Sequence, residues 1–283
     1  MTGLLAEFGK KLAERWAAVL VLPGLVFVAV ATVAFTLRQR HWADVGALTR
    51  FADRLPRQNG VFATAVLLIV LLLGSFAAGL VAHALGTPVE HVLSGRWPSG
   101  FLRRALTDRR RDAWTAADER CREAGGDLAE SIARRNRIAM IEPRSPTWIG
   151  DRLAAPAIRI RDDYGLDLPF TWSRLWLLLP ESSRQPLTES RRRFDDATAL
   201  GGWAVLYLLL GIVWWPAAVA GVVVWLVAWR RCRAAAEVYA DLVEAAVDVH
   251  VGDFLGKFTG ETGVLPARPQ WGEQLTERFR KGM

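Results

Sequence analysis

The segment that comes closest to a nucleotide-binding motif is GDFLGKFTG, from Gly252 to Gly260. A Gly-Lys pair followed by a hydroxyl residue is typical of a phosphate-binding loop. Here three residues instead of four separate Gly252 from Gly256, Phe258 stands where serine or threonine is needed, and a helical pattern precedes the segment where a strand is required. We therefore interpret it as a helix end that breaks into a glycine-rich tail.

The residue types that bind metals are few and widely separated. No histidine has a second histidine at the i+3 or i+4 spacing that a zinc site on a helix requires. The sequence also lacks Gly-x-Ser-x-Gly, His-Glu-x-x-His and a glycine fingerprint after a strand. We expect neither a metal nor another cofactor, two free thiols, and no enzymatic activity. The residues considered are His41, His83, His91, His250, Cys121 and Cys232.

The composition of the chain indicates where it is located but does not indicate a reaction. Hydrophobic residues make up 52% of the 283 residues, and they concentrate in three long uncharged blocks, which is typical of membrane segments. The formal net charge is +7, but no segment has the one-signed excess of a nucleic-acid-binding domain. Arginine clusters flank the blocks, so we expect anionic lipid headgroups and not nucleic acid as partners.

The first two blocks each have the length of a membrane span. Residues 16–37 are uncharged and follow an amphipathic segment, residues 1–15, which we expect to lie along the membrane surface. The second span covers about residues 61–85 and contains small residues at a spacing that lets another helix approach closely. The helix-packing candidates, including two from the third block, are Gly74, Ser75, Ala78, Gly79, Ala217 and Gly221.

The third block, residues 197–229, is too long for one span. A single helix of this length would measure about 50 Å, whereas the hydrocarbon core is about 30 Å thick. A hairpin with its turn near 214–216 fits better, because Trp214 and Trp215 suit a headgroup boundary and Pro216 suits the start of a second helix. The second arm is short, so a re-entrant hairpin and one tilted helix remain as alternatives.

Charge at the ends of the blocks predicts the topology. Arginine triplets and pairs stand at the open ends of the third block and none at its tip, which places those ends in the cytoplasm. Residues 87–196 and 230–283 would then be cytoplasmic, as would both termini, although five arginines fall in the external stretch 38–60. The arginine-rich composition indicates a GC-rich bacterium, so we expect a multi-pass protein of the bacterial plasma membrane.

The cytoplasmic region reads as helical, with one irregular stretch. Thr87 and Pro88 predict the start of a short separate helix, and residues 106–140 predict a helical hairpin broken at Gly125-Gly126. Several prolines make the stretch up to residue 169 irregular, and the run 170–180 is either an interfacial or a buried helix. The expected interface anchors are Trp172, Trp176, Trp214, Trp215, Arg191, Arg192, Arg193, Arg230 and Arg231.

An acidic stripe follows the last block. Its members recur at i, i+4, i+7 and i+11, so they share one face of a helix that continues from the membrane. Such a stripe is usually solvated, but it is also complementary to the arginine-rich hairpin at 103–137, within one subunit or between subunits. The residues of this partner-docking candidate are Glu237, Asp241, Glu244 and Asp248.

Residues 146–250 resemble an uncharacterised family of integral membrane proteins from high-GC, actinobacteria-like bacteria. The resemblance lies in the segments PTWIGDRL and YGLDLPFTWSRLWLLLP, which an arginine-rich helix and a membrane hairpin follow. The resemblance implies a membrane location, but it identifies no functional residue in this sequence. The sequence thus predicts an all-α integral membrane protein with two transmembrane helical hairpins, about four spans, and an α-helical cytoplasmic region between them. We expect an interaction or scaffold subunit that presents this region to a protein partner or a second copy; the alternative is an oligomeric channel gated by a hydrophobic constriction.

Overall fold

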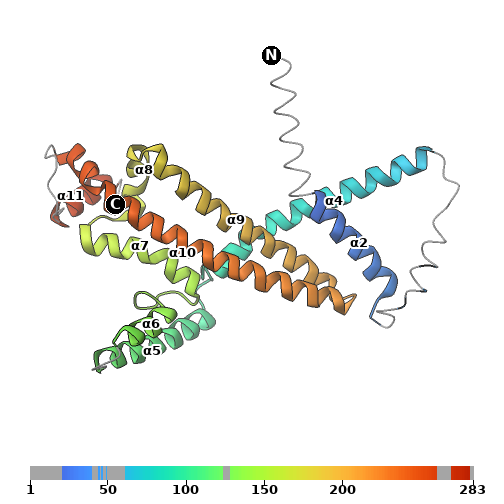
Figure 1. Ribbon diagram of the computed structural model, residues 1–283, viewed down its shortest axis with the longest axis horizontal. Helices are drawn as coiled ribbons and strands as arrows, with labels where there is room; N and C mark the ends of the chain where they lie inside the picture. Colours follow the sequence, from blue (N-terminus) through green and yellow to red (C-terminus); the bar gives the residue numbers. More distant parts are fainter. Residues whose placement is uncertain are drawn as a thin grey trace, which may run out of the picture. The chain divides into compact units, whose positions relative to one another are not determined.

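The computed structural model describes residues 21–39, 44, 46, 49, 61–123, 128–259 and 269–280. Over these residues the chain forms nine α-helices and no strand, so the all-α prediction is confirmed (Figure 1). The chain divides into two compact units. Unit 1 comprises residues up to Val89 together with Asp196–Arg230, and unit 2 comprises Glu90–Asp195 together with Arg231 onward. The two long helices α9 (Glu181–Leu210) and α10 (Trp215–Thr259) contribute to both units.

Unit 1 begins with two apolar helices, α2 (Leu22–Leu37) and α4 (Val61–Leu93). Residues 1–15 and the start of the first expected span lie outside the described residues. Helix α4 continues through Pro88, so the separate helix expected from Thr87 does not exist. Proline removes one backbone donor from a helix. Here tertiary packing outweighs that cost, because Val89 is buried one residue later.

One face of α4 carries a stripe of small and buried residues. Close approach is evident where the backbone of α9 meets it, since a side chain at Gly202 would collide with the carbonyl oxygen of Ala82. A side chain at Gly24 of α2 would likewise meet the backbone of Ser75. Helices approach this closely only where neither presents a bulky side chain. The buried residues of the stripe are Ser75, Gly79, Ala82, Gly86 and Val89.

The small-residue candidates of α4 therefore separate into two groups. Ser75 and Gly79 are buried, whereas Gly74 is exposed and an added Cβ there would have its nearest neighbour, Cγ2 of Val28, at 3.9 Å. Ala78 is half-buried. The line through Ser75 and Gly79 thus faces other helices, while Gly74 faces outward.

The uncharged run 197–229 forms two helices and not one. Helix α9 ends at Leu210, a turn covers residues 211–214, and α10 begins at Trp215, slightly earlier than the turn near 214–216 that the proline suggested. Gln39 holds this turn: its Nε2 donates to the carbonyl oxygens of Gly211 (3.1 Å) and Ile212 (2.9 Å), and its Oε1 accepts from the Trp215 amide (3.2 Å). Backbone groups at the turn are thereby paired.

The two arms of this hairpin pack tightly within unit 1. A side chain at Gly221 would meet the Leu208 backbone nitrogen at 2.8 Å, so the α9 and α10 backbones are close at this level. Ala217 is buried with Ala34 and Leu210, and Trp214 packs against that cluster. Trp215 is exposed. Both packing candidates of the third block therefore lie where the arms touch.

One described helix is long and apolar enough to cross a bilayer. It is the stretch Thr64–Leu93 of α4, which has a mean hydropathy of 2.7 over its most apolar 18 residues, and only 17% of those residues are buried. Helix α2 is apolar but shorter. The expectation of four spans is therefore not supported by helix length and composition, because charged residues enter the long helices α9 and α10 within a few turns.

Unit 2 contains the helical hairpin expected between residues 106 and 140. Helix α5 (Phe101–Glu123) and helix α6 (Leu128–Ile138) pack against each other. The expected break at Gly125-Gly126 lies outside the described residues. The stretch expected to be irregular instead forms helix α7 (Trp148–Tyr164), with Pro156 inside it. Thr147 caps its start by accepting from the Gly150 amide at 3.1 Å, and Gly165 ends it in the left-handed conformation with φ of 67°.

The core of unit 2 lies among α7, α8 (Leu168–Leu178), the charged halves of α9 and α10, and α11 (Pro269–Phe279). Thr171 and Leu175 of α8 are buried, so the run 170–180 is a helix of this core. Helix α11 joins through Thr276, whose hydroxyl accepts from the Asp167 amide at 3.0 Å. The largest fully buried side chains of this core are Phe254, Ile160, Leu179, Leu187, Val247 and Val251.

Candidate functional site

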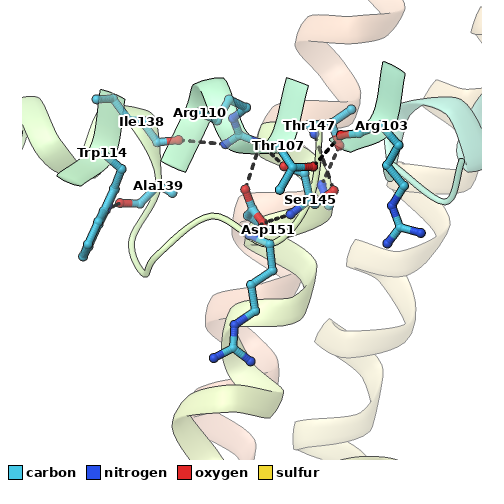
Figure 2. Close-up of polar contacts among 11 residues, drawn as sticks. Arg103, Thr107, Arg110, Trp114, Ile138, Ala139, Ser145, Thr147 and Asp151 are labelled. Atoms are coloured by element: carbon cyan, nitrogen blue, oxygen red, sulfur yellow. Dashed lines mark hydrogen bonds and ion pairs between the residues drawn. The ribbon is translucent and has the colours of Figure 1, made fainter. Parts of the chain in front are cut away.

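The hairpin α5–α6 is attached to α7 by a partly buried ion pair, which Figure 2 shows in detail. Nη1 of Arg110 lies 2.8 Å from Oδ2 of Asp151 and donates to the carbonyl oxygen of Ser145 at 2.9 Å. Nη2 of the same arginine donates to the carbonyl oxygen of Ile138 at 2.9 Å. One guanidinium from α5 thus fixes the end of α6, the following loop and the first turn of α7. We call this arrangement the Arg110–Asp151 clamp.

Asp151 completes the clamp from the other side. Its Oδ1 accepts from the backbone amides of Arg144 (2.9 Å) and Ser145 (2.7 Å). The residue is only 4% exposed, and burial raises the pKa of its carboxyl although both amides and Arg110 oppose that shift. Burial likewise lowers the pKa of Arg110. A buried charge is tolerated when it is paired and hydrogen-bonded. Here Oδ1 of Asp151 accepts from two amides and Oδ2 is ion-paired with Arg110.

The hairpin has its own internal contacts beyond the clamp. Nη1 of Arg135 on α6 lies 2.7 Å from Oδ1 of Asp118 on α5, and the guanidinium of Arg135 lies 5.7 Å from the ring centroid of Trp114. The hydrogen bond from Arg135 is the main reason that the pKa of Asp118 is lowered. The Trp114 indole in turn donates to the carbonyl oxygen of Ala139 at 3.0 Å.

Helix α6 contributes no fully buried side chain to the unit. Its exposed residues include Leu128, Ala133 and Arg137, and its internal pair Glu130–Arg134 is also exposed. A helix that is fixed at its base and inward face, and that leaves its other side chains in solvent, is a preorganised surface. The outer face of α6 is therefore the candidate site for recognition by another molecule.

Four of the expected interface anchors meet in one pocket of unit 2. Trp172 and Trp176 of α8, with ring centroids 5.9 Å apart, and Arg191 and Arg192 of α9 line a cavity of about 530 Å³ whose far wall is Tyr239. Arg191 pairs with Glu90 at 2.8 Å and Asp195 at 2.9 Å. The tryptophans are half-buried and pack against the unit 2 core.

The other anchors lie apart from this pocket. Arg193 is exposed and pairs with Glu189 of its own helix at 3.2 Å. Arg230 and Arg231 are exposed on α10 at the boundary between the two units. Trp214 ends the turn of the α9–α10 hairpin, and Trp215 is the first residue of α10. The expected set of anchors is therefore not one site.

The acidic stripe of α10 contacts α7 instead of the arginine-rich hairpin at 103–137. Arg152, which is 4% exposed, pairs with Asp241 and lies 3.8 Å from Glu244. Glu244 also lies 3.1 Å from Nη1 of Arg159. Arginines of the stretch expected to be irregular thus engage the stripe within the chain, because that stretch is a helix that presents them on one face.

The two ends of the stripe differ in what they contact. At the C-terminal end, Asp248 accepts from the Tyr164 hydroxyl at 2.8 Å. At the N-terminal end, Glu237 is exposed. Only the middle and the C-terminal end of the stripe are therefore used by α7.

The Tyr164–Asp248 contact predicts a measurable pH dependence. Burial, followed by the hydrogen bond to Asp248, raises the pKa of Tyr164 to about 12. Because the pKa is higher in the folded state, the stabilisation is fully present below the unfolded value of about 10 and is lost as the pH rises through about 12. We expect Asp248→Asn to lower the pKa of Tyr164 while leaving it above 10, since burial persists.

A tyrosinate absorbance titration measures this shift. The sequence holds three tyrosines, so the difference between the wild-type and Tyr164→Phe curves isolates Tyr164. Superimposable Tyr164 curves for the wild type and Asp248→Asn would show that the hydrogen bond has no influence.

Within the described part of the chain, no three residues of the metal-binding types cluster. Cys232 is fully buried, and burial, with the nearby Glu90 carboxylate, raises the pKa of its thiol to about 12, which makes it a poor nucleophile. His250 contacts the Ser183 hydroxyl at 3.2 Å. Residues 252–259 of the glycine-lysine segment are helical and form no phosphate loop.

No family model, curated protein or solved structure significantly matches this chain.

Proposed function

We propose that the protein is a membrane-anchored interaction subunit. The apolar helices of unit 1 anchor it in a bacterial plasma membrane, and unit 2 presents the outer face of α6 to a protein partner on the cytoplasmic side. The observation that carries this proposal is the hairpin α5–α6, because the Arg110–Asp151 clamp holds it in one orientation while α6 buries no side chain of its own. A rigid exposed helix loses little conformational entropy when it binds.

Exposed apolar surface supports the anchoring half of the proposal. Beyond α4, the arms 197–210 and 215–229 and the turn between them expose Leu209, Ile212 and Val223. Contiguous apolar surface of this kind is rare on soluble monomers. At 1.5 Å per residue these arms measure about 21–22 Å, less than the hydrocarbon thickness of about 30 Å. We therefore propose that α4 spans, and that the α9–α10 hairpin enters the membrane and thins it locally or remains re-entrant.

Site-specific photo-crosslinking in native membranes tests the partner-binding half. A photoreactive residue is placed at Ala133 or Arg137 on the outer face of α6, and the matched control carries it at Val249, an exposed position of α10 in the same unit. We expect a discrete adduct from both α6 positions and none from the control. An adduct of twice the chain mass would identify the partner as a second copy.

Two results would contradict the proposal. Identical adducts from Val249 and from the α6 positions, or no adduct from α6, would show that the outer face of α6 is not a recognition surface. Release of the protein from membranes by an alkaline carbonate wash would show that unit 1 does not anchor it in the bilayer.

A further inference from the structure

A second pocket of unit 2 is dominated by arginines. It has a volume of about 250 Å³ and lies at the start of α5. Its polar lining includes Ser99, Arg103, Arg104, Asp108, Arg111 and Arg144. Neither the membrane anchors nor the outer face of α6 uses this pocket.

The positive charge of this arginine pocket is only partly compensated. Arg111 lies 3.7 Å from Asp108 and 2.9 Å from Glu142, so both nearby carboxylates are engaged by one arginine. Arg104 and Arg144 form no ion pair with any residue that the structure describes. The pocket is lined by four arginines and one carboxylate, Asp108, and Glu142 lies beside it as a partner of Arg111. An excess of positive charge therefore remains at the pocket.

The pocket is also held in shape. Nη1 of Arg103 contacts the carbonyl oxygen of Trp97 at 3.5 Å, and the backbone amide of Arg144 is fixed by Asp151 of the clamp. Figure 2 shows Arg103 and Thr107 on the same helix as Arg110. The clamp that orients the hairpin thus also brings Arg144, distant in sequence, to the start of α5.

Planar guanidinium groups bind phosphate oxygens in pairs, which makes clustered arginines the preferred receptor for phosphate. The first amides of α5 add favourable dipoles at the same place. A cavity of about 250 Å³ has room for a phosphate group. We propose that the arginine pocket binds the phosphate group of a phosphomonoester.

The source of the phosphate is a lipid headgroup or a small soluble phosphate. Phe101 and Leu102 follow Gly100 of the pocket lining in the chain, and they are 88% and 62% exposed. Helix α4 ends at Leu93, a few residues earlier. Exposed apolar residues next to arginines are typical of a membrane-surface contact. The inference that the phosphate belongs to a lipid rests on the proposed membrane anchoring, whereas the inference of a phosphate site does not.

Binding is measured by isothermal titration on the full chain in maltoside detergent. One arm adds short-chain phosphatidic acid in the same micelles, and the other adds inorganic pyrophosphate. The test variant is Arg104→Gln with Arg144→Gln. The control is Arg109→Gln, which removes the same type of charge from an exposed position of α5 outside the pocket.

We expect the double variant to lose at least about tenfold in affinity, because each charge-assisted hydrogen bond contributes roughly that factor. The control should bind like the wild type. Binding of phosphatidic acid alone identifies a lipid, and binding of pyrophosphate identifies a soluble phosphate. Equal losses in the test and control variants, wild-type affinity in the double variant, or no binding in either arm would overturn the proposal. An unchanged Tyr164 titration shows that the variants remain folded, and none of these outcomes depends on the α6 crosslinks.

Discussion

Asp151→Ala should lower the free energy of unfolding of unit 2 by about 3–5 kcal/mol, the largest effect of any single substitution proposed. The change leaves the partly buried guanidinium of Arg110 without its counter-charge and the amides of Arg144 and Ser145 without their acceptor. Uncompensated buried polar groups retain their full cost of desolvation. Denaturant unfolding of the detergent-solubilised protein, followed by tryptophan fluorescence, measures the loss.

The matched control is Asp163→Ala on the same helix. Asp163 is half-exposed and pairs with Arg159 one turn away at 3.4 Å, so its loss should remain within about 0.5 kcal/mol. A double variant, Arg110→Met with Asp151→Asn, removes both charges but keeps an acceptor for the two amides. We expect it to be more stable than Asp151→Ala, since a buried ion pair contributes little net stability. Equal losses for Asp151→Ala and Asp163→Ala would show that the clamp does not hold the unit together.

Local sequence signals predicted the elements whose ends are marked by breakers. Gly125-Gly126 separates two polar helices, and the uncharged run 197–229 is too long for one membrane span. Both features can be judged from the local sequence, because glycine weakens a helix where it stands and the length of a helix follows from its number of residues. The order of helices was therefore largely predictable.

Prolines misled the sequence interpretation where tertiary packing overrides them. Pro88 lies inside α4 and Pro156 inside α7. In α7 the neighbouring Ala155 and Ile160 are buried in unit 2, and Thr147 caps the first turn. Propensity is a weak guide when packing stabilises the helix. The pattern Pro-Thr-Trp-Ile-Gly-Asp did contain a signal, because a threonine cap followed by an acidic residue in the first turn marks a helix start.

The clamp and the arginine pocket were not predictable from spacing. Asp151 looks like any other aspartate in the sequence, and only the folded chain places it against Arg110 of α5. Arg110 and Arg144 are brought together from positions far apart in the chain. The acidic stripe was visible as a pattern, but its partner Arg152 became visible only once α7 was known to be a helix.

In unit 1, Gly202→Leu should have the second-largest effect, lowering stability by about 1–3 kcal/mol or more. A side chain at this position collides with the carbonyl oxygen of Ala82 on α4, a backbone atom that cannot rotate away. The helices must separate, and the contacts along the small-residue stripe of α4 are lost. Thermal unfolding of the protein in lipid nanodiscs measures the change.

Gly74→Leu is the matched control, because it places the same side chain on the exposed face of α4, where the nearest atom to an added Cβ is Cγ2 of Val28 at 3.9 Å. Both substitutions replace glycine inside a helix and so gain the same helix propensity, which cancels in the comparison. We expect Gly74→Leu to be neutral or slightly stabilising. Similar losses for both would mean that the face of α4 carrying Gly74 is also packed, whereas a loss at Gly202 alone identifies the stripe through Ser75 and Gly79 as the face that holds unit 1 together.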